Sequence, residues 1–449
     1  MGARCCRTKK LSDAASRDIR LQPQREGVIR SIAWLDIGFN PQIFMNKRLL
    51  YFGDAPITSG FGKVTSNLLS RFRYEFDDID VWGINYSGWP HDKPYRIYPG
   101  GTDDFFVRIN KFIALIPEIK PTHVLINQDL FNLSAACNLE FPEKLLKLAT
   151  LMEFKTTVYF PVDSYVPSSW LKILHCVDNS VAYHPAAAET IVDCGGPYCN
   201  AIGHGVDRSI FHPRNRLEAR KHFGCPEDWL DKLIVTNVNI NQRRKAIPDT
   251  LQLFAKLKQR GYDRLRLFLH MKPFNRDEVT NIEMIADQLG LKPFEDYLHT
   301  GRSWIGEVPP LKEESIACIF QMSDLVLTTS LGEGWGFAQS EALMCGTPIA
   351  APDHFGSKHI MDVADRCGLS KFVTRLPIST HGVALWNDNS IVRYPIDMEE
   401  SVETIETALE GIRPCGQPFD PTQALCDEFD WDTISNKFLA LMVGERVAD

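Results

Sequence analysis

The spacing of hydrophobic residues along the chain switches repeatedly between two patterns. Short runs of consecutive apolar residues are typical of buried parallel strands, and apolar residues that recur every three or four positions are typical of helices packed by one face. In the first half, strand-like runs lie at 49–54, 79–84, 123–127, 156–160 and 180–183. Two helical stretches between them are built on Val64, Leu68, Leu69, Phe72 and Phe76, and on Phe105, Ile109, Phe112, Ile113 and Ile116. This alternation predicts a parallel sheet covered by helices on both faces.

The alternation breaks at residues 203–213 and then restarts. Predicted strands follow at 233–238, 265–270, 296–299, 324–329 and 348–351, and predicted helices at 248–260, 281–289, 312–322, 401–412 and 431–442. Two consecutive units of this kind predict an α/β protein with two Rossmann-like, doubly wound parallel-sheet domains that face an interdomain cleft. Ligands of such sheets bind at the carboxyl ends of the strands.

The predicted domain boundaries follow from these patterns. The N-terminal domain is expected at 45–204, an interdomain linker at 205–230, and the C-terminal domain at 231–430. A C-terminal helix within 431–449 is expected to cross back to the N-terminal domain. Residues 1–44 have only weak periodicity and predict a disordered extension. Residues 1–30 are basic and polar and have no apolar core, so they do not predict a secretory signal, and Cys6 stands where a myristoylation signal needs Ser or Thr.

Composition narrows the classes of partner. The 449 residues carry a net charge of -8, which does not predict the clustered basic surface of a nucleic-acid-binding protein. No apolar run approaches the roughly 18 residues of a transmembrane helix, which leaves only peripheral contact with a membrane open. The twelve cysteines include no CxxC pair and no Cys/His cluster with zinc spacing, as expected for free thiols in a reducing cytoplasm.

The segment 330–348 carries the strongest chemical signal. A predicted buried strand ends before a loop with glycines at 332, 334 and 336, so the backbone at Gly334 and Gly336 can approach a ligand closely. A short helix is expected from about Phe337, and its free N–H groups suit a phosphate. Glu333 in the loop and Glu341 in the helix can both face this ligand, because a carboxylate accepts two hydrogen bonds from a sugar diol. Alternatively, Glu341 only complements the helix dipole and the glycines are turn residues.

Two further loops follow predicted strands. Residues 237–246 contain three adjacent cations, Arg243, Arg244 and Lys245, which suit a diphosphate leaving group or form a solvated basic turn. Gly60 and Gly62 lie between the first strand and a helix expected to begin near Val64. This loop is either an anion cradle or an ordinary tight turn.

Several of these segments together resemble the family-4 (group 1) glycosyltransferases, which are retaining enzymes of the GT-B fold. Residues 333–341 resemble the family's E-x7-E signature. Gly205-Val206-Asp207 with Phe211-His212-Pro213 resembles its interdomain segment, and Asn85-Tyr86-Ser87-Gly88 and Tyr159-Phe160-Pro161-Val162-Asp163 resemble the N-terminal domain of one subset. The resemblance covers roughly residues 47–444. It implies that the domain at 45–204 lies on the acceptor side and the domain at 231–430 on the nucleotide-sugar donor side.

The resemblance implies roles for individual residues. Glu333 would contact hydroxyls of the donor sugar, Glu341 would hold the nucleotide ribose, and the backbone at Gly336 and Phe337 would meet the diphosphate. Lys245 fits the family's lysine. The usual arginine falls on Ile240 or Asn239, so Arg244 or Arg243 is expected to replace it, with Arg244 and Lys245 facing the cleft and Arg243 facing solvent.

Asp163 stands near the position of a family histidine, where it orients the acceptor or the donor, or else caps a turn. Gln128 and Asp129, after the preceding strand, have a similar standing. The predicted function is therefore glycosyl transfer from a nucleotide-diphosphate sugar to an acceptor hydroxyl on a glycan, lipid or small molecule, with retention and without a metal ion or other cofactor. The alternatives are a nucleotide-sugar epimerase of similar fold and a non-catalytic sugar-nucleotide-binding protein.

Overall fold

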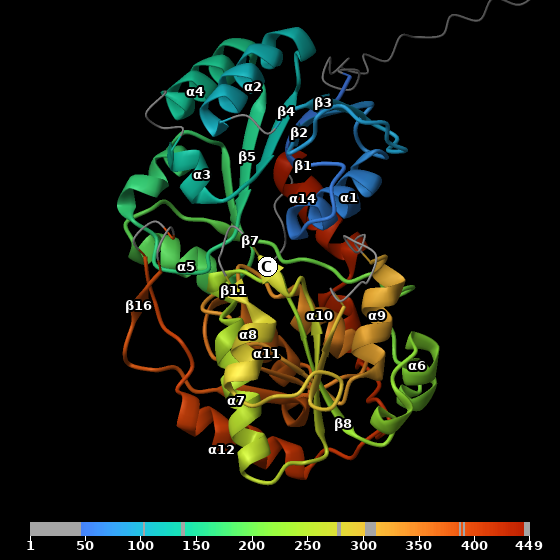
Figure 1. Ribbon diagram of the computed structural model, residues 1–449. Coiled ribbons are helices and arrows are strands. Elements are labelled where there is room, and N and C mark those ends of the chain that lie inside the picture. Colours follow the sequence, from blue (N-terminus) through green and yellow to red (C-terminus); the bar gives the residue numbers. More distant parts are fainter. Residues whose placement is uncertain are drawn as a thin grey trace, which may run out of the picture. The chain divides into compact units, whose positions relative to one another are not determined.

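The chain divides into two units, Met1–Met45 and Asn46–Asp449. The structure, a computed structural model, describes residues 46–101, 104–135, 140–275, 280–300, 311–385, 388 and 391–443 (Figure 1). The predicted extension at 1–44 lies outside the described residues. No helix in the described ranges combines the length and the apolar character that crossing a membrane requires.

The first sheet has seven parallel strands. They are β1 (Arg48–Asp54), β2 (Asp78–Ile84), β3 (Arg96–Pro99), β4 (His123–Asn127), β5 (Lys155–Phe160), β6 (Asn179–Ala182) and β7 (Asn200–Ala201). Their order is β3-β2-β1-β4-β5-β6-β7, and every neighbouring pair is parallel. The order reverses between β1 and β4, so the loops after these two strands diverge and leave room for a ligand.

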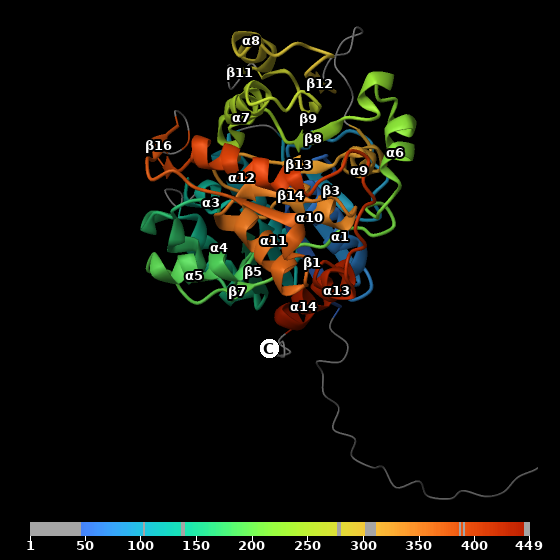
Figure 2. The ribbon, with the colours of Figure 1, turned by 90° about the horizontal axis from the view of Figure 1, so that it is seen from below.

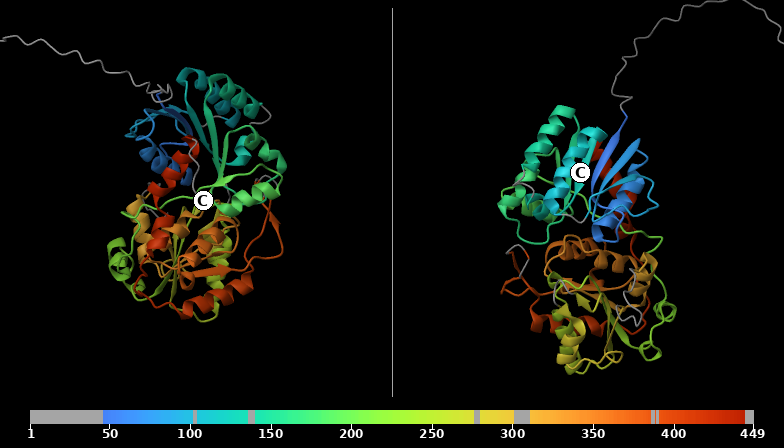
Figure 3. Two further views of the ribbon diagram at one scale, coloured as in Figure 1. Left: turned by 180° about the vertical axis from the view of Figure 1, so that it is seen from behind. Right: turned by 45° about the horizontal axis from the view of Figure 1, so that its top comes forward.

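Successive residues of β1 pack against different helices, as the two-residue period of a strand requires. Leu49 and Tyr51 join a cluster with α1 (Gly60–Phe72) and α14 (Trp431–Val443), and Leu50 and Phe52 join one with α2 (Phe105–Ile119) and α4 (Phe141–Met152). The sheet is therefore covered on both faces (Figure 3). Three shorter helices complete this half: α3 (Leu130–Ala135), the 3-10 helix η3 (Ser168–His175) and α5 (Pro185–Asp193).

The second sheet repeats this topology with six parallel strands. They are β8 (Leu233–Val238), β9 (Leu265–His270), β12 (Tyr297–His299), β13 (Leu325–Leu327), β14 (Ile349–Pro352) and β15 (Val373–Leu376), in the order β12-β9-β8-β13-β14-β15. Its reversal lies between β8 and β13. The predicted pair of doubly wound parallel-sheet domains is confirmed.

Helices cover both faces of the second sheet as well (Figure 2). One cluster contains α7 (Ile247–Gln259), α8 (Ile282–Gln288) and α12 (Met398–Glu410), and another contains α6 (Arg216–Phe223) and α9 (Glu313–Met322). The remaining elements are η4 (Glu227–Trp229), η5 (Arg243–Lys245), α10 (Phe337–Met344), α11 (Phe355–Arg366), η6 (Ser370–Phe372), α13 (Gln423–Glu428) and two short hairpins, β10 (Phe274–Asn275) with β11 (Thr280–Asn281) and β16 (Val383–Ala384) with β17 (Val392–Arg393).

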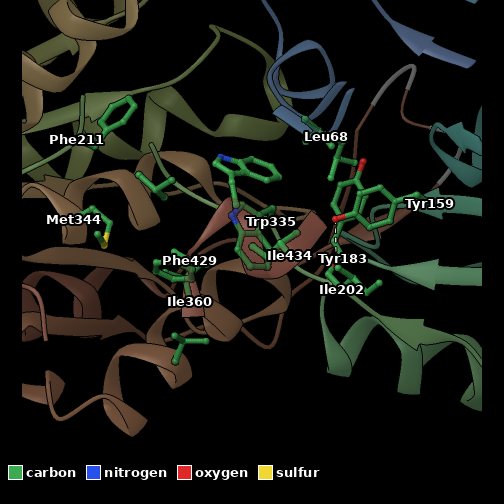
Figure 4. Packing of buried hydrophobic residues seen from close by; sticks show 14 of the residues in the cluster. Leu68, Tyr159, Tyr183, Ile202, Phe211, Trp335, Met344, Ile360, Phe429 and Ile434 are labelled. Atoms are coloured by element: carbon green, nitrogen blue, oxygen red, sulfur yellow. Dashed lines mark hydrogen bonds between the residues drawn. The ribbon is translucent and has the colours of Figure 1, made fainter. Parts of the chain in front are cut away.

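One apolar cluster contains side chains from both halves (Figure 4). Leu68 and Tyr159 come from the first half, and Trp335 and Met344 from the second. A Cβ atom at Gly203 would lie 2.6 Å from the Trp335 ring, so only glycine permits this contact. In the same cluster Phe438 of α14 packs against Tyr159, with ring centroids 4.7 Å apart. Burial of these large apolar surfaces is the main force that holds the two halves together.

One expectation about local structure needs correction, and the expected linker contains helices that the sequence did not predict. Helix α1 begins at Gly60 rather than near Val64, because the Ser59 hydroxyl accepts a hydrogen bond from the backbone N–H of Gly62 and caps the helix there. Residues 216–229, expected within the linker, form α6 and η4, and Trp229 is completely buried. The apolar positions of this segment are too few to show a helical period, and buried arginines anchor it instead.

Arg220 anchors α6 to the second sheet. Its guanidinium is fully buried, contacts Asp324 at 2.5 Å, and donates to the backbone carbonyls of Met322, Leu230 and Lys232. Asp324 also accepts hydrogen bonds from backbone N–H groups, including that of Ile234. The charge pair is thus buried but well hydrogen-bonded, which is the condition under which burial of two charges is tolerated.

Arg220→Ala should destabilise the protein by about 3 kcal/mol, because it leaves the buried Asp324 carboxylate without its main counter-charge. The measurement is the free energy of unfolding from denaturant titration. Arg264→Ala, which removes an exposed ion pair with Asp231, is the matched control and should change the midpoint little. Equal effects of the two substitutions would contradict this account of α6.

Candidate active site

The loops that follow the central strands of the two sheets meet one another. Helix η5 follows β8, residues 328–336 follow β13, and residues 161–164 follow β5. Two pairs of oppositely charged side chains connect these loops: Lys245 with Glu333, and Arg244 with Asp163. The carboxyl ends of both sheets thus contribute to one site, as expected for doubly wound sheets.

Lys245 and Glu333 form a buried ion pair. The Lys245 ammonium lies 2.6 Å from each carboxylate oxygen of Glu333, and the two residues are 8% and 9% exposed. Burial alone would raise the pKa of Glu333, but Lys245 and Arg244 outweigh it and hold this pKa below its ordinary value. Glu333 is therefore charged at neutral pH. The ammonium has three N–H donors, so it can bind a further acceptor besides Glu333.

Asp163 is gripped by two arginines. One Arg244 nitrogen lies 3.1 Å from its carboxylate, and Arg393 donates to the Asp163 backbone carbonyl at 2.9 Å and to its carboxylate at 3.5 Å. Burial would raise the pKa of Asp163, but Arg244, Arg393 and Lys245 together lower it below its ordinary value. Arg244 also donates to the carbonyl of Gly332. Asp163 is thus an ion-pair partner, which goes beyond the turn cap considered from sequence.

Gly334 lies at a close approach of the two halves. A Cβ atom at this residue would lie 2.3 Å from the Cβ of Pro161, which is far inside contact distance. The glycine is therefore required by the contact between residues 332–336 and the loop after β5. From sequence we expected bare backbone facing a ligand, whereas the nearest atoms at this position belong to the other half of the protein.

The N-terminus of α10 is a separate feature. Gly336 caps it with a φ of +108°, a value that favours glycine, and the first N–H groups of a helix have no acceptor within the helix. The Phe337 ring stacks on His204 with centroids 5.1 Å apart, which fixes this end of the helix. A Cβ atom at Gly60 would meet the Phe337 ring at 3.8 Å, whereas one at Gly62 would meet the carbonyl of Ile57 at 2.1 Å. Gly60 thus lies beside the N-terminal end of α10, whereas Gly62 is required by the close approach of Ile57 within its own loop.

Glu341 is buried and contacts Lys63 across the two halves. Lys63 of α1 also lies 2.9 Å from Glu313 of α9, and its ammonium lies 5.3 Å from the centre of the Phe337 ring. Burial raises the pKa of Glu341 despite the attraction of Lys63. Sequence analysis gave Lys63 no role, although its position directly after Gly60-Phe61-Gly62 placed it at the start of α1. The alternative in which Glu341 only complements the helix dipole does not account for its ion pair with Lys63.

A pocket of about 180 Å³ adjoins Asp163 and Arg244. Its lining comes from the loops after β4 and β5, from η3, and from residues near β17: Asp129, Leu130, Phe131, Pro161, Val162, Asp163, Ser164, Val166, Trp170, Arg244, Asp388, Ile391 and Arg393. Burial, and after it the neighbouring Asp163, raise the pKa of Asp129 to about 7, while Arg244 opposes this increase and Asp54 adds to it. Asp388 and Arg393 have no role predicted from the sequence, because residues 377–397 show neither the hydrophobic pattern of a strand nor that of a helix.

Arg243 is partly buried and makes interactions of its own. It lies with Arg244 and Lys245 in the 3-10 helix η5. Among the described residues, no three His, Cys, Asp or Glu side chains converge as a metal site would require.

Comparison with known sequences finds glycosyltransferases. The chain is 32% identical over 191 residues to a D-inositol 3-phosphate glycosyltransferase of Mycolicibacterium paratuberculosis (strain ATCC BAA-968 / K-10), and 31% identical over 186 residues to that of Mycobacterium leprae (strain Br4923). The first match covers 42% of this chain and the second 41%, and each covers 37% of its relative. The chain thus matches little more than a third of the length of these relatives. No family model matches the chain.

Comparison with solved structures finds the same fold over most of the chain. A sucrose-phosphate synthase of Thermosynechococcus elongatus superposes with a TM-score of 0.65 at 15% identity, covering 89% of this chain and 98% of that one. The Anabaena protein HepE in complex with UDP-glucose gives a TM-score of 0.58 at 14% identity, covering 88% and 99%. The predicted GT-B fold is confirmed. The partial matches to D-inositol 3-phosphate glycosyltransferases agree with the resemblance to group 1 glycosyltransferases.

Asp129→Asn should remove a pH dependence of stability. The pKa of about 7 in the folded protein lies above the unfolded value of about 3.9, so the folded state binds this proton more tightly and the free energy of unfolding falls as pH rises between these values. The stability of the variant relative to the wild type should therefore increase from about pH 4 to about pH 7 and then level off. Denaturant titrations across this range measure it.

The exposed Asp228→Asn is the matched control, and its stability relative to the wild type should not follow this course. If the stability of Asp129→Asn relative to the wild type does not change between about pH 4 and pH 7, the folded protein does not hold this proton more tightly than the unfolded chain.

Proposed function

We propose that this chain, a relative of the group 1 glycosyltransferases, transfers a sugar from a nucleotide-diphosphate sugar to an acceptor hydroxyl. The observation that carries the proposal is the meeting of Lys245, Arg244 and Glu333 between the two sheets. An ionised, buried carboxylate beside two cations suits a reaction in which a sugar carbon becomes positive and a diphosphate departs.

The donor would lie along the C-terminal half. Glu341 would hold the ribose, and the N-terminus of α10 at Gly336 and Phe337 would meet the diphosphate, with Gly60 close to this end. Lys63, which contacts Glu341, would lie within reach of the same phosphates. Glu333 would accept hydrogen bonds from hydroxyls of the transferred sugar.

Lys245 and Arg244 would stabilise the departing diphosphate. Negative charge grows on the leaving group as the glycosidic bond breaks, and fixed cations in a site with little water stabilise it without reorganisation. In this proposal they supply the positive charge without a metal ion. Attack by the acceptor from the face that the diphosphate leaves would give retention, which the family resemblance supports.

UDP-glucose is the first donor to test, because HepE, a structural neighbour, is described in complexes with UDP and UDP-glucose. Labelled UDP-, GDP- and ADP-sugars should be incubated with the whole protein. Hydrolysis or transfer supports the proposal, inversion at the sugar C2 carbon indicates an epimerase, and binding without reaction indicates a non-catalytic protein. If the protein neither binds nor converts any of these donors, all three candidate functions are contradicted.

Glu333→Gln should lower turnover by about 10²- to 10³-fold with little change in donor affinity, because it removes a charge that acts on the reacting sugar. Glu341→Ala should do the opposite and weaken binding of the nucleoside diphosphate alone, since a hydrogen bond to a charged group is worth about 1.5–3 kcal/mol. Calorimetry and initial rates separate the two. The exposed Glu314→Gln on α9 is the control and should change neither quantity.

Wild-type turnover in a folded Glu333→Gln protein would exclude its proposed role. Unchanged nucleotide affinity in Glu341→Ala would leave that residue as a partner of Lys63 only.

Lys245→Ala and Arg244→Ala should each lower turnover strongly, and the double variant should lose less than the sum of the two effects. The two cations act on one diphosphate, and residues that share a partner couple by about 0.5–3 kcal/mol. Arg244→Lys should restore part of the activity, because an ammonium cannot reproduce the two-pronged grip of a guanidinium. A double-mutant cycle on donor hydrolysis, with folding checked by thermal melting, provides the measurement.

Arg243→Ala is the neighbouring control in this cycle and should affect turnover least. If Arg243 proves the sensitive position, the assignment within the basic run is wrong by one residue. Full additivity of Lys245→Ala and Arg244→Ala would show that the two cations act on different groups.

A further inference from the structure

The pocket beside Asp163 combines an apolar wall with a charged floor. Phe131 of α3 and Trp170 of η3 have ring centroids 5.4 Å apart, with ring planes inclined at 59°, and both line the pocket. Leu130, Val166 and Ile391 extend this apolar wall. A ligand that fits must offer both a C–H face and polar groups.

The charged side chains of the pocket determine which polar groups of a ligand it can bind. The lining contains two cations, Arg244 and Arg393, and three carboxylates, Asp129, Asp163 and Asp388. Arg393, which is 6% exposed, lies between two carboxylates: it donates to Asp163 and, at 3.1 Å, to Asp388. Arg244 is paired with Asp163. Both guanidiniums of the lining therefore already have a carboxylate partner.

An anionic ligand would be unfavourable in such a pocket. A phosphate monoester at Arg393 would have to displace Asp163 or Asp388, or bring its charge close to these carboxylates, and like charges placed together are unfavourable. Arg244 would not serve the acceptor, because in the proposed function it acts on the donor diphosphate. A neutral hydroxyl group can donate to a carboxylate and accept from a guanidinium without breaking either pair. The ring of a sugar or cyclitol presents such hydroxyls at its edge and apolar C–H groups on its face.

Resting on the function proposed above, we infer that this pocket is the acceptor site and that it selects an uncharged sugar or cyclitol over its phosphate ester. Phe131 and Trp170 contact the ring face, and Asp129, Asp163 and Arg393 contact the hydroxyls. Asp388 acts as a specificity residue, because it neutralises the side of Arg393 that would otherwise bind a phosphate.

The experiment uses the whole protein with UDP-glucose and matched acceptors: glucose against glucose 6-phosphate, and myo-inositol against its 3-phosphate. At least one neutral acceptor should exceed its ester by about tenfold or more in kcat/KM. Trp170→Ala should raise the acceptor KM by about tenfold or more through loss of the ring contact, while UDP affinity and donor hydrolysis without acceptor stay unchanged. Tyr165→Ala, an exposed aromatic residue next to the lining, is the control.

Asp388→Asn provides the sharper test. It keeps the size of the side chain and removes the negative charge beside Arg393, so activity with the phosphate ester should rise relative to the neutral acceptor by about fivefold or more. The rate of donor hydrolysis without acceptor should not change in the same way.

Preference of the wild type for the phosphate esters, or no acceptor preference at all, would overturn the inference while leaving the proposed function standing. The inference would also be overturned if the protein hydrolyses the donor but binds no neutral acceptor. Failure to bind UDP or to react with any donor would instead refute the proposed function, and the acceptor inference with it.

Discussion

The site depends on the close approach of residues 332–336 to the loop after β5. A Cβ atom at Gly334 would lie 2.3 Å from the Cβ of Pro161, and one at Gly332 would lie 2.0 Å from the carbonyl oxygen of Asp163. Trp335, the residue after Gly334, packs its ring against Gly203 in the apolar cluster that joins the two halves. Apolar burial therefore holds the halves together at this point, and the glycines allow their polar backbones to meet.

This approach brings charges together that would be costly if they were buried singly. Arg244 meets Asp163 from the other half, and Lys245 meets Glu333 within its own half. A buried carboxylate or ammonium loses its hydration, so each needs a partner and further hydrogen bonds. The pairs leave N–H donors of Lys245 and carboxylate oxygens of Glu333 able to bind a ligand, so the same interactions serve stability and the proposed chemistry.

Much of the site was visible in the sequence, and what escaped has a common cause. Glu333 and Lys245 lie in the segments that follow β13 and β8, and Glu341 lies in the short helix α10 that comes next, so local pattern predicts where they stand. Lys63 and Arg393 act through partners far along the chain: Lys63 contacts Glu341, 278 residues away, and Arg393 contacts Asp163, 230 residues away. No local period marks such pairs, because they depend on how the two sheets are joined.

By itself, the sequence determined the alternation of strands and helices, the two parallel sheets and the loops that carry the charged residues, since each depends on a period of two or 3.6 residues and on glycine or proline at its ends. Only the tertiary structure decided which loop faces which. It placed Asp163 between two arginines, turned Gly334 toward Pro161, and formed α6 around the buried Arg220, where the sequence suggested a linker. These outcomes depend on packing and on charge pairing between distant residues, and both are settled only when the apolar surfaces of the two halves meet.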